Sequence, residues 1–499
     1  MCFASGAGKP SDTDEQQNRT LRGGMAVTCG LEPVYRHIDE NLGVHLAKIQ
    51  QFLRQPSISD DGTGIHDCAE LLRSYYESLG AQEASIVRTD GHPGVVAWYD
   101  AGASKTIVNY CMYDVMPVEG EQWISPPFEA NVVNLEGVGR AIVARGAINS
   151  KGPYRAWLNA LESIIAVNGK LPVNVLFVAE GEEELGSPNF SQVVDSVSDR
   201  LKDADAVLNC GASQDLSGNV EMFLGNKGVI DFELRASGKR WGRGPAEYSI
   251  HSSNKAIVDS PVWHLVKALS SLTSDDGNRV AVEGFYDDVA PPSEEDLELV
   301  SRLEAEFEPA MWAKKYGVSR WMNDMPKREL LENYLFSPTL NITGIGAGYT
   351  GPGCKTILPH EALAKFDMRL VRDMKSADML PKLRKHLDAR GFSDVEIRQL
   401  SGYEWSRTSH KSEVVQAVLS VYHDYGIKPL IWPTSGGSAP MYLFTREPYM
   451  LPLASAGIGH GARAHAPNEY YVVESIGKIA GLAECEKFFV DVLYRFASS

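Results

Sequence analysis

The chain has 499 residues, of which 43% are hydrophobic, so it can bury a large core and should divide into two or more domains. Its 48 Lys and Arg stand against 65 Asp and Glu. The resulting net charge of −17 argues against a nucleic-acid or anionic-membrane partner. Because no apolar run approaches the ~20 residues of a membrane span and no secretory signal pattern opens the chain, we expect a cytoplasmic protein. The seven cysteines are scattered without a CxxC spacing, which predicts no disulfide framework.

The first part of the chain reads as a tail followed by alternating helices and strands. Residues 1–25 are rich in Gly, Ser, Asp and Gln and are expected to be disordered, and Met25 is an alternative start. Hydrophobic periodicity then predicts helices over residues 34–55, 68–79, 154–166 and 191–202, and strands over 85–87, 95–99, 105–110 and 173–178. This alternation predicts an α/β domain with a largely parallel sheet flanked by helices, whose sites lie at the carboxyl ends of strands.

A second module is expected from about residue 228. It reads as a strand over 228–236, a Gly-rich loop over 237–244, a helix over 261–272, an acidic helical insertion over 293–307, strands over 339–343 and 363–371, and a helix over 379–389. That order suits a smaller α+β lid domain. We therefore predict a catalytic domain from residues 26–227 and 412–499 and a lid, or dimerisation, domain from 228–411.

The run Phe177-Val-Ala-Glu-Gly-Glu-Glu-Glu-Leu-Gly-Ser187 carries the strongest chemical signal. A carboxylate cluster directly after an apolar strand is where co-catalytic metallohydrolases place a general base and a metal ligand. A Glu-Glu pair alone is more often a solvated helix start, so its neighbours decide the interpretation. Two further motifs precede this run, Tyr110-Cys-Met-Tyr-Asp-Val115 and Arg145-Gly-Ala-Ile-Asn-Ser-Lys-Gly152. Three more come after it, Ile250-His-Ser-Ser253, Asp367-Met-Arg-Leu-Val371 and Ala464-His-Ala-Pro-Asn-Glu469.

Over roughly residues 30 to 490 these motifs resemble those of the M20 family of metallopeptidases, which includes carnosinase, carboxypeptidase G and acylamino-acid deacylase relatives. The resemblance implies that Glu183 is the general base, that Glu184 and His465 are metal ligands, and that Asp114 is a retained site residue. It also shows departures. Met112 stands where the family has a metal-binding His, Asn149 where it has the bridging Asp, and Asn209-Cys-Gly211 where another Asp is expected.

The lid positions of the family are also matched. The resemblance implies that His251 reaches the partner subunit's site in a homodimer and polarises the scissile carbonyl. It implies that Arg369 grips a substrate carboxylate and that Ser438, in Gly436-Gly-Ser438, and Asn341 contact substrate. The expected partners are therefore a small carboxylate-bearing molecule and a second copy of the chain.

The substitutions weaken the implied metal site. Asn149 offers a neutral carbonyl oxygen in place of a bridging carboxylate, and Met112 offers a thioether that zinc rarely uses. Two strong ligands are left, Glu184 and His465, with Asn149 as a weak third and Cys210 as a further weak candidate. Catalytic zinc normally takes three protein ligands and water. We therefore expect either one Zn²⁺ or Mn²⁺ ion or a metal-free site.

Without metal, the site still holds a catalytic set. Like-charge repulsion beside Glu184 and partial burial should raise the pKa of Glu183 toward neutrality, which suits a general base. His251 and Arg369 would stabilise an oxyanion, and Asp114 would orient a neighbour. We predict a hydrolase that cleaves an amide or other C–N bond of a peptide-like or acyl-amino-acid-like substrate. The alternatives are an acyl-transfer or elimination enzyme on the same scaffold and a ligand-binding homologue without catalysis.

Overall fold

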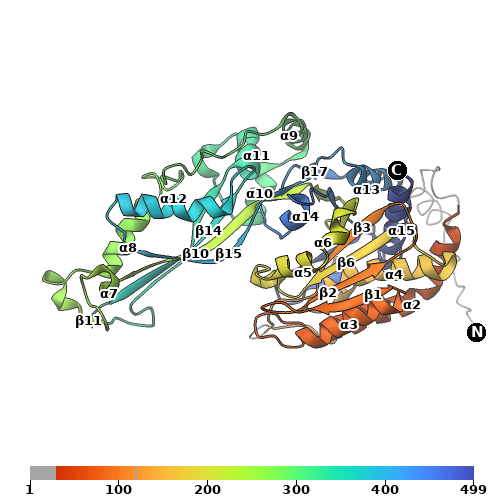
Figure 1. Cartoon of the computed structure of the whole chain (residues 1–499), viewed down its shortest axis with the longest axis horizontal. Helices are drawn as coiled ribbons and strands as arrows, with labels where there is room; N and C mark the ends of the chain where they lie inside the picture. Colours follow the sequence, from red (N-terminus) through yellow and green to blue (C-terminus); the bar gives the residue numbers. More distant parts are fainter. Residues whose placement is uncertain (1–29, 119, 121) are drawn as a thin grey trace, which may run out of the picture. The chain divides into compact units, whose positions relative to one another are not determined.

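The computed structural model describes residues 30–499 except 119 and 121 (Figure 1). The predicted tail over 1–25 and the alternative start Met25 lie outside the described residues. The described chain forms two compact units. Unit 1 comprises the described residues up to Met222, Thr408–Ile431 and Glu447–Ser499, and unit 2 comprises Phe223–Arg407 and Trp432–Arg446.

This division differs from the predicted bounds at residues 223–227, 408–411 and 432–446. Residues 432–446, which the sequence led us to place with the first domain, belong to unit 2. Trp432 explains the difference, because its ring stacks on Phe223 and Trp312, both residues of unit 2, with centroids 6.0 and 5.5 Å apart. The chain passes between the units within β8 (Glu221–Phe223) and β17 (Leu430–Trp432).

Unit 1 alternates helices and strands as the periodicity predicts. Its helices are α2 (Glu32–Arg54), α3 (Ile65–Ser78), α4 (Lys151–Asn168), the 3-10 turn η1 (Glu183–Leu185), α5 (Phe190–Ser196), α6 (Ser198–Lys202), α13 (Glu413–Asp424) and α15 (Leu482–Ser498). Its main strands are β1 (Glu83–Val87), β2 (Gly94–Tyr99), β3 (Thr106–Met112), β6 (Asn174–Glu180), β7 (Ala206–Cys210) and β18 (Leu453–Ala456). The single helix predicted over 191–202 is wrong, since the chain breaks at Val197 into α5 and α6.

The six main strands form one mixed sheet in the order β1-β2-β6-β3-β7-β18. The pairings β6-β3, β3-β7 and β7-β18 are parallel, whereas β1-β2 and β2-β6 are antiparallel. Strands β3 and β6 are buried along their whole length, as expected for parallel strands covered on both faces. The α/β class predicted from the sequence is thus confirmed.

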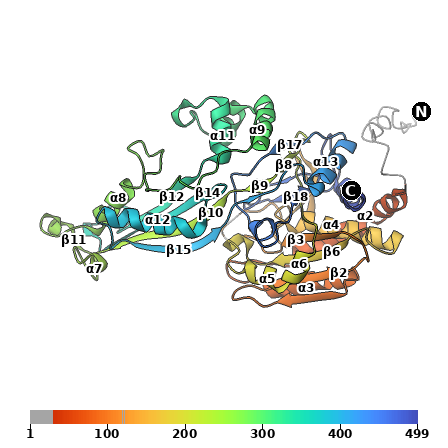
Figure 2. The same ribbon diagram turned by 45° about the horizontal axis from the view of Figure 1, so that its top comes forward.

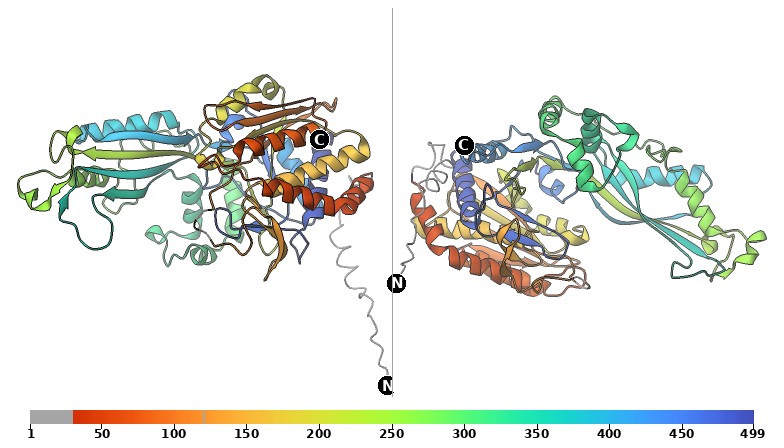
Figure 3. Two further views of the ribbon diagram at one scale, coloured as in Figure 1. Left: turned by 90° about the horizontal axis from the view of Figure 1, so that it is seen from below. Right: turned by 180° about the vertical axis from the view of Figure 1, so that it is seen from behind.

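Helices cover both faces of this sheet (Figures 2 and 3). On β6, Phe177 stacks on Tyr76 of α3 at 4.4 Å between centroids. On β3, Tyr110 packs edge-on against Phe190 of α5 at 5.5 Å. Because Phe177 pairs with Asn109 in the sheet, Tyr110 points to the opposite face from Phe177, so α3 and α5 lie on opposite sides. The six-stranded sheet therefore has the helix-covered faces typical of doubly wound folds.

A second, smaller sheet of unit 1 joins two motifs that are distant in sequence. It contains β4 (Asn131–Leu135), β5 (Gly139–Val143), β19 (Gly461–Ala462) and β20 (Tyr470–Val472), in the order β19-β20-β5-β4. Strand β20 pairs with β5, and the backbone N–H of Ala144 donates to the carbonyl of Glu469. The loop that follows β5 is thereby fixed beside the loop between β19 and β20.

Unit 2 is built on a four-stranded antiparallel sheet of order β12-β14-β10-β15. The four strands of this sheet are β10 (Gly228–Ser237), β12 (Thr339–Ala347), β14 (Glu361–Leu370) and β15 (Glu396–Tyr403). The unit also contains the short strands β9 (Gly225–Asn226), β11 (Ile250–His251), β13 (Ile357–Leu358) and β16 (Ser406–Arg407). Its helices are α7 (Gly238–Trp241), η2 (Ser252–Ala256), α8 (Pro261–Ser270), α9 (Glu294–Glu306), α10 (Pro309–Tyr316), η3 (Met322–Asp324), α11 (Lys327–Phe336), α12 (Ser376–Ala389) and α14 (Tyr442–Thr445). The predicted loop over 237–244 is wrong at its start, where Ser237 caps α7 by accepting the N–H of Arg240.

The two faces of this sheet differ in polarity. Helices α8 and α12 pack on one face, where Phe232 and Phe366 stack at 4.9 Å within the core of the unit. Residues alternate along β14, so Asp367 and Arg369 point to the opposite face. That second face presents the polar side chains considered below.

Cysteines 68, 111, 210, 354 and 485, which lie in the described part of the chain, are free thiols. Among residues 30–499, with 119 and 121 left out, no helix is long and apolar enough to cross a membrane.

Candidate active site

The carboxylate cluster of unit 1 forms where two parallel strands end side by side. Met112 at the end of β3 is the register partner of Glu180 at the end of β6, so the residues that follow each strand meet at one edge of the sheet. Asp114 follows β3 and is fully buried. Its Oδ1 accepts the N–H of Glu183 at 3.1 Å, and its Oδ2 accepts the N–H of Glu184 at 3.0 Å. Asp114 therefore holds the turn that presents both glutamates.

Burial and mutual repulsion shift the three carboxyl groups toward neutrality. Burial raises the pKa of Asp114 to about 6, although the N–H groups of Glu184 and Glu183 oppose the shift. Burial, followed by the charge of Asp114, raises the pKa of Glu183 to about 7. Burial and the charges of Glu183 and Asp114 raise the pKa of Glu184 to about 8. The cluster can therefore hold and exchange protons at neutral pH.

Asn149, Glu184 and His465 converge at this edge. The Asn149 Nδ2 donates to Glu184 Oε1 at 2.7 Å and lies 3.1 Å from His465 Nε2. His465 Nε2 is also 3.1 Å from Glu184 Oε2, within hydrogen-bond distance. Glu184 is only 5% exposed, whereas His465 is 53% exposed. The structure thus brings together Asp114, Asn149, Glu183, Glu184 and His465.

Glu469 is a site residue that sequence reasoning missed. It is fully buried, and its two oxygens accept the N–H groups of Gly146, Ile148 and Asn149 at 2.9 to 3.1 Å. The same carboxylate pairs with the buried Arg145 at 3.1 Å. Glu469 therefore fixes the loop that carries Asn149. One available signal was its position four residues after His465, within the motif Ala464-His-Ala-Pro-Asn-Glu469. The motif that Glu469 contacts begins with an oppositely charged residue, Arg145.

Cys210 and Met112 lie at strand ends but add no metal ligand group. The buried Cys210 thiol accepts a hydrogen bond from Asn109 Nδ2 at 3.7 Å. Burial raises the pKa of Cys210 well above that of a free thiol, which disfavours the thiolate that binds zinc. Met112 is 7% exposed at the end of β3. Neither residue supplies a charge to compensate the lost carboxylate.

In unit 2, the three residues predicted to bind substrate gather around Asp367. Arg369 Nε donates to Asp367 Oδ2 at 3.1 Å, and Asn341 Nδ2 donates to Asp367 Oδ1 at 2.9 Å. Arg369 Nη1 donates to Ser438 Oγ at 2.8 Å. Strand register explains the arrangement, since Asn341 of β12 pairs with Asp367 of β14. Asp367 orients Arg369 and Asn341, a role that the sequence did not reveal.

His251 lies in a separate two-stranded ribbon of unit 2, in which β11 pairs with β13. Its Nδ1 accepts the N–H of Ser253 at 3.2 Å and lies 2.8 Å from Ser253 Oγ, and its Nε2 is 3.3 Å from Thr356 Oγ1. The imidazole is exposed. These contacts set the ring orientation while leaving the side chain accessible.

The residues of unit 1 do not fit the pair of metal ions that the resemblance implies. Asn149 faces both Glu184 and His465 with its amide nitrogen, which has no lone pair to donate to a metal. Within the described parts of the chain, no three His, Cys, Asp or Glu side chains form a group that could hold a metal ion. Glu184 and His465 are two strong ligands, one fewer than catalytic zinc normally takes.

Comparison with known proteins places this architecture. The model of the Peptidase family M20/M25/M40 matches residues 113–485, and the chain belongs to that family. Among solved structures, it resembles the M20 family metallo-carboxypeptidase Sso-CP2 from Sulfolobus solfataricus, with 36% identity and a TM-score of 0.81, covering 91% of this chain and 99% of that one.

Two groups of relatives are dipeptidases. The chain is 28% identical to the Beta-Ala-His dipeptidase of Rattus norvegicus over 72% of each chain. It is 25% identical to the Cys-Gly metallodipeptidase DUG1 of Candida albicans over 88% of this chain and 93% of the relative. The human carnosine dipeptidase 1 structure shares the fold, with a TM-score of 0.73 at 22% identity and coverage of 94% and 100%. The family resemblance read from the sequence is confirmed.

Proposed function

We propose that this chain is a hydrolase of the M20 type that cleaves an amide or other C–N bond of a small, carboxylate-bearing, peptide-like or acyl-amino-acid-like substrate. Its metal site is degenerate and holds at most one ion, and Glu183 is the general base. The observation that carries the proposal is the cluster of Asp114, Glu183 and Glu184 at the joined ends of β3 and β6. Family membership and the dipeptidase relatives support C–N bond hydrolysis.

The protons of the cluster fit general acid–base catalysis. Glu183, with a pKa of about 7, is ionised in a large fraction of molecules at neutral pH and can take a proton from water. Glu184, whose pKa is raised to about 8, holds a proton at neutral pH and can return it to the leaving nitrogen. Asp114 keeps Glu183 and Glu184 on one turn, so both steps use groups in a fixed geometry.

Residues of unit 2 would bind the substrate and stabilise the transition state. The Arg369 guanidinium, oriented by Asp367 and Ser438, suits a carboxylate, which matches a planar fork of N–H donors. His251 would polarise the scissile carbonyl of a partner subunit in a cytoplasmic homodimer. Strand β12 supports pairing of two copies, because it is an edge strand of its sheet and exposes Ile342 and Ile345.

A second candidate is a ligand-binding homologue, or an acyl-transfer or elimination enzyme on the same scaffold. The amide of Asn149 between Glu184 and His465 favours these, since hydrolysis of an unactivated amide gains much from a metal-bridging carboxylate. The retained pair of Glu183 and Asp114 favours an enzyme over a binder, because ligand binding alone does not need a buried base.

Replacement of Glu183 by Gln tests the proposal. Turnover of a panel of dipeptides and acyl-amino acids should fall about 100- to 10,000-fold, with ligand affinity unchanged, because general-base catalysis contributes that range. Glu136→Gln is the control, since Glu136 is exposed in the turn between β4 and β5 and is not part of the cluster. Undiminished turnover in the Glu183 variant would remove the assignment of the base. Turnover by neither the wild-type protein nor the variants would favour the binder.

A further inference from the structure

Lys227 is a buried cation whose role the site described above does not include. It lies between β9 and β10, and only 5% of the residue is exposed. Its ammonium donates to the carbonyl of Ser337 at 2.7 Å, the one acceptor that it has among the residues described by the structure. An ammonium carries three donors, and a buried charge normally has a counterion. Within the same described residues, Lys227 forms no ion pair with an acid.

Strand register places this ammonium beside Arg369. Val229, two residues after Lys227, pairs with Arg369 on one side of β14, and Thr339, two residues after Ser337, pairs with Arg369 on the other side. Since β14 lies between β10 and β12, the contact from Lys227 Nζ to Ser337 spans the end of β14 that carries Arg369. One turn also contacts both residues: the carbonyl of Gly437 accepts the backbone N–H of Lys227, and the Ser438 hydroxyl accepts from Arg369 Nη1.

The charges at this location do not balance. Asp367 lies 3.1 Å from Arg369 Nε, so these two residues form a neutral pair. Lys227 adds one positive charge without an acid to compensate it. The Arg369 side chain is 32% exposed, and its Nη2 has no hydrogen bond within the described part of the chain, so one arm of its fork is open. The excess of one positive charge, in a chain of net charge −17, complements one carboxylate.

We propose that Lys227 is the second cation of an anion subsite in unit 2, and that this subsite selects a ligand carboxylate over the corresponding neutral amide. The inference deepens the proposed function, because the ligand group is the carboxylate of the proposed substrate. Arg369 provides the directional contact, and Lys227 provides the net charge that the Arg369–Asp367 pair lacks. Without Lys227 the subsite is neutral.

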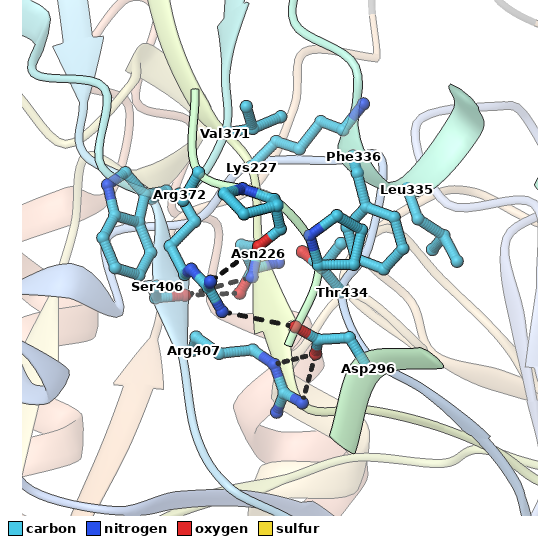
Figure 4. Close-up of a pocket in the computed structure, with 14 residues that line it drawn as sticks. Asn226, Lys227, Asp296, Leu335, Phe336, Val371, Arg372, Ser406, Arg407 and Thr434 are labelled. Carbon is cyan, nitrogen blue, oxygen red and sulfur yellow. Dashed lines mark hydrogen bonds and ion pairs between the residues drawn. The ribbon is translucent and has the colours of Figure 1, made fainter. Parts of the chain in front are cut away.

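The neighbouring charged groups agree with this role. Burial, followed by the charge of Arg369, lowers the pKa of Lys227 to about 8. Lys227 also lines a pocket with Arg372, Arg407 and Asp296 (Figure 4). The Asp296 carboxylate is occupied by Arg407 at 2.8 Å and Arg372 at 3.4 Å, and in Figure 4 the Lys227 side chain extends away from these ion pairs. Asp296 is therefore not a counterion of Lys227.

Calorimetric titration of the full chain tests the subsite with paired probes. The probes are N-benzoyl derivatives of glycine, leucine and glutamate, each compared with its C-terminal amide at neutral pH. The wild-type protein should bind at least one carboxylate about 10- to 100-fold more tightly than its amide, as expected for a hydrogen bond to a charged group. Lys227→Met should lose most of that ratio, and Lys227→Arg should keep it. Lys365→Met is the matched control, because Lys365 is an exposed cation on the same strand as Arg369.

Thermal unfolding separates this role from a structural one. Removal of a buried, uncompensated charge should leave the melting temperature of Lys227→Met unchanged or higher. An unchanged carboxylate-to-amide ratio in Lys227→Met, or a wild-type protein that prefers no carboxylate of the panel, would overturn the proposal. Because binding is measured without turnover, a Lys227-dependent ratio in a protein that hydrolyses nothing would overturn the hydrolase and support the subsite.

Discussion

The two units hold charge imbalances of opposite sign. At the ends of β3 and β6 in unit 1, Asp114, Glu183 and Glu184 are buried close together, and burial and repulsion raise their pKa values to about 6, 7 and 8. On the polar face of unit 2, Lys227 is buried near Arg369, and its pKa is lowered to about 8. Burial and like charges therefore bring the pKa values of both sets of groups close to neutrality, raising those of the acids and lowering that of the lysine.

The difference indicates what each location binds. Protons, or a cation, can compensate the excess carboxylates of unit 1, whereas only an anion can compensate the excess cation of unit 2. Asn149 matters for the charge of unit 1, because an aspartate at this position would add a fourth acid to the cluster. A bound metal ion would then be needed to compensate the added charge. These opposite imbalances are the basis for proposing proton transfer in unit 1 and carboxylate binding in unit 2.

The largest expected effect comes from restoring metal ligands in unit 1. Asn149→Asp combined with Met112→His adds a carboxylate and an imidazole at the positions that the family resemblance assigns to metal binding. Zinc affinity should rise on the order of 1,000- to 10,000-fold, since each strong ligand contributes several kcal/mol to structural zinc sites. Elemental analysis and competition with a chromogenic chelator measure the change. The single variants serve as controls, and zinc at background level in the double variant would show that these positions do not converge.

A second prediction concerns the buried support of Asn149. Glu469→Gln breaks a buried ion pair with Arg145 and places an amide N–H₂ against backbone donors, so the free energy of unfolding of unit 1 should fall by about 3–5 kcal/mol. Denaturant titration measures it. Glu474→Gln is the control, because Glu474 pairs with Arg140 on the surface, where about 1 kcal/mol or less is expected. Equal small losses in both variants would mean that Glu469 does not anchor the loop.

The smallest expected effect tests the sign of the imbalance in unit 2. Below pH 8 Lys227 is protonated in the folded and the unfolded protein, so the folded state bears the full cost of the buried charge. Between pH 8 and about 10.4 the folded lysine is neutral while the unfolded one is charged, and that cost disappears. Lys227→Met should therefore gain up to about 3 kcal/mol over the wild-type protein below pH 8, and the gain should shrink toward pH 10. Chemical denaturation of both proteins across this pH range measures the difference in their free energies of unfolding. A difference that stayed constant with pH would contradict the presence of a buried, charged lysine.

The sequence predicted the elements that position the site better than the contacts within it. Strands β3 and β6 and the alternation around them were found from apolar runs, and the structure brings the residues that follow them, Asp114, Glu183 and Glu184, together at one sheet edge. Glu469 and Asp367 were missed, because each acts through hydrogen bonds to backbone or side chains that are distant in sequence. Such partners follow from register, as in the pairing of β5 with β20, and not from local pattern.

The remaining errors in the fold have similar causes. The helix breaks because Val197, between α5 and α6, leaves the helical backbone angles. The one-turn helix α7 depends on a local cap, in which the N–H of Arg240 donates to the Ser237 hydroxyl. The assignment of residues 432–446 to unit 2 depends on the stacking of Trp432 against Phe223 and Trp312. Periodicity finds apolar faces, but it does not say which partner covers them.

Metal content and chelator sensitivity test the central claim most directly. The protein would be purified without chelator and assayed by elemental analysis, with turnover of the dipeptide and acyl-amino-acid panel measured before and after chelation. We expect at most one metal ion per chain and turnover that depends on Glu183. Two tightly bound ions per chain, with turnover abolished by chelation, would contradict this expectation. The residues around Glu184 and His465 would then form a complete two-metal site, although they include only two strong metal ligands.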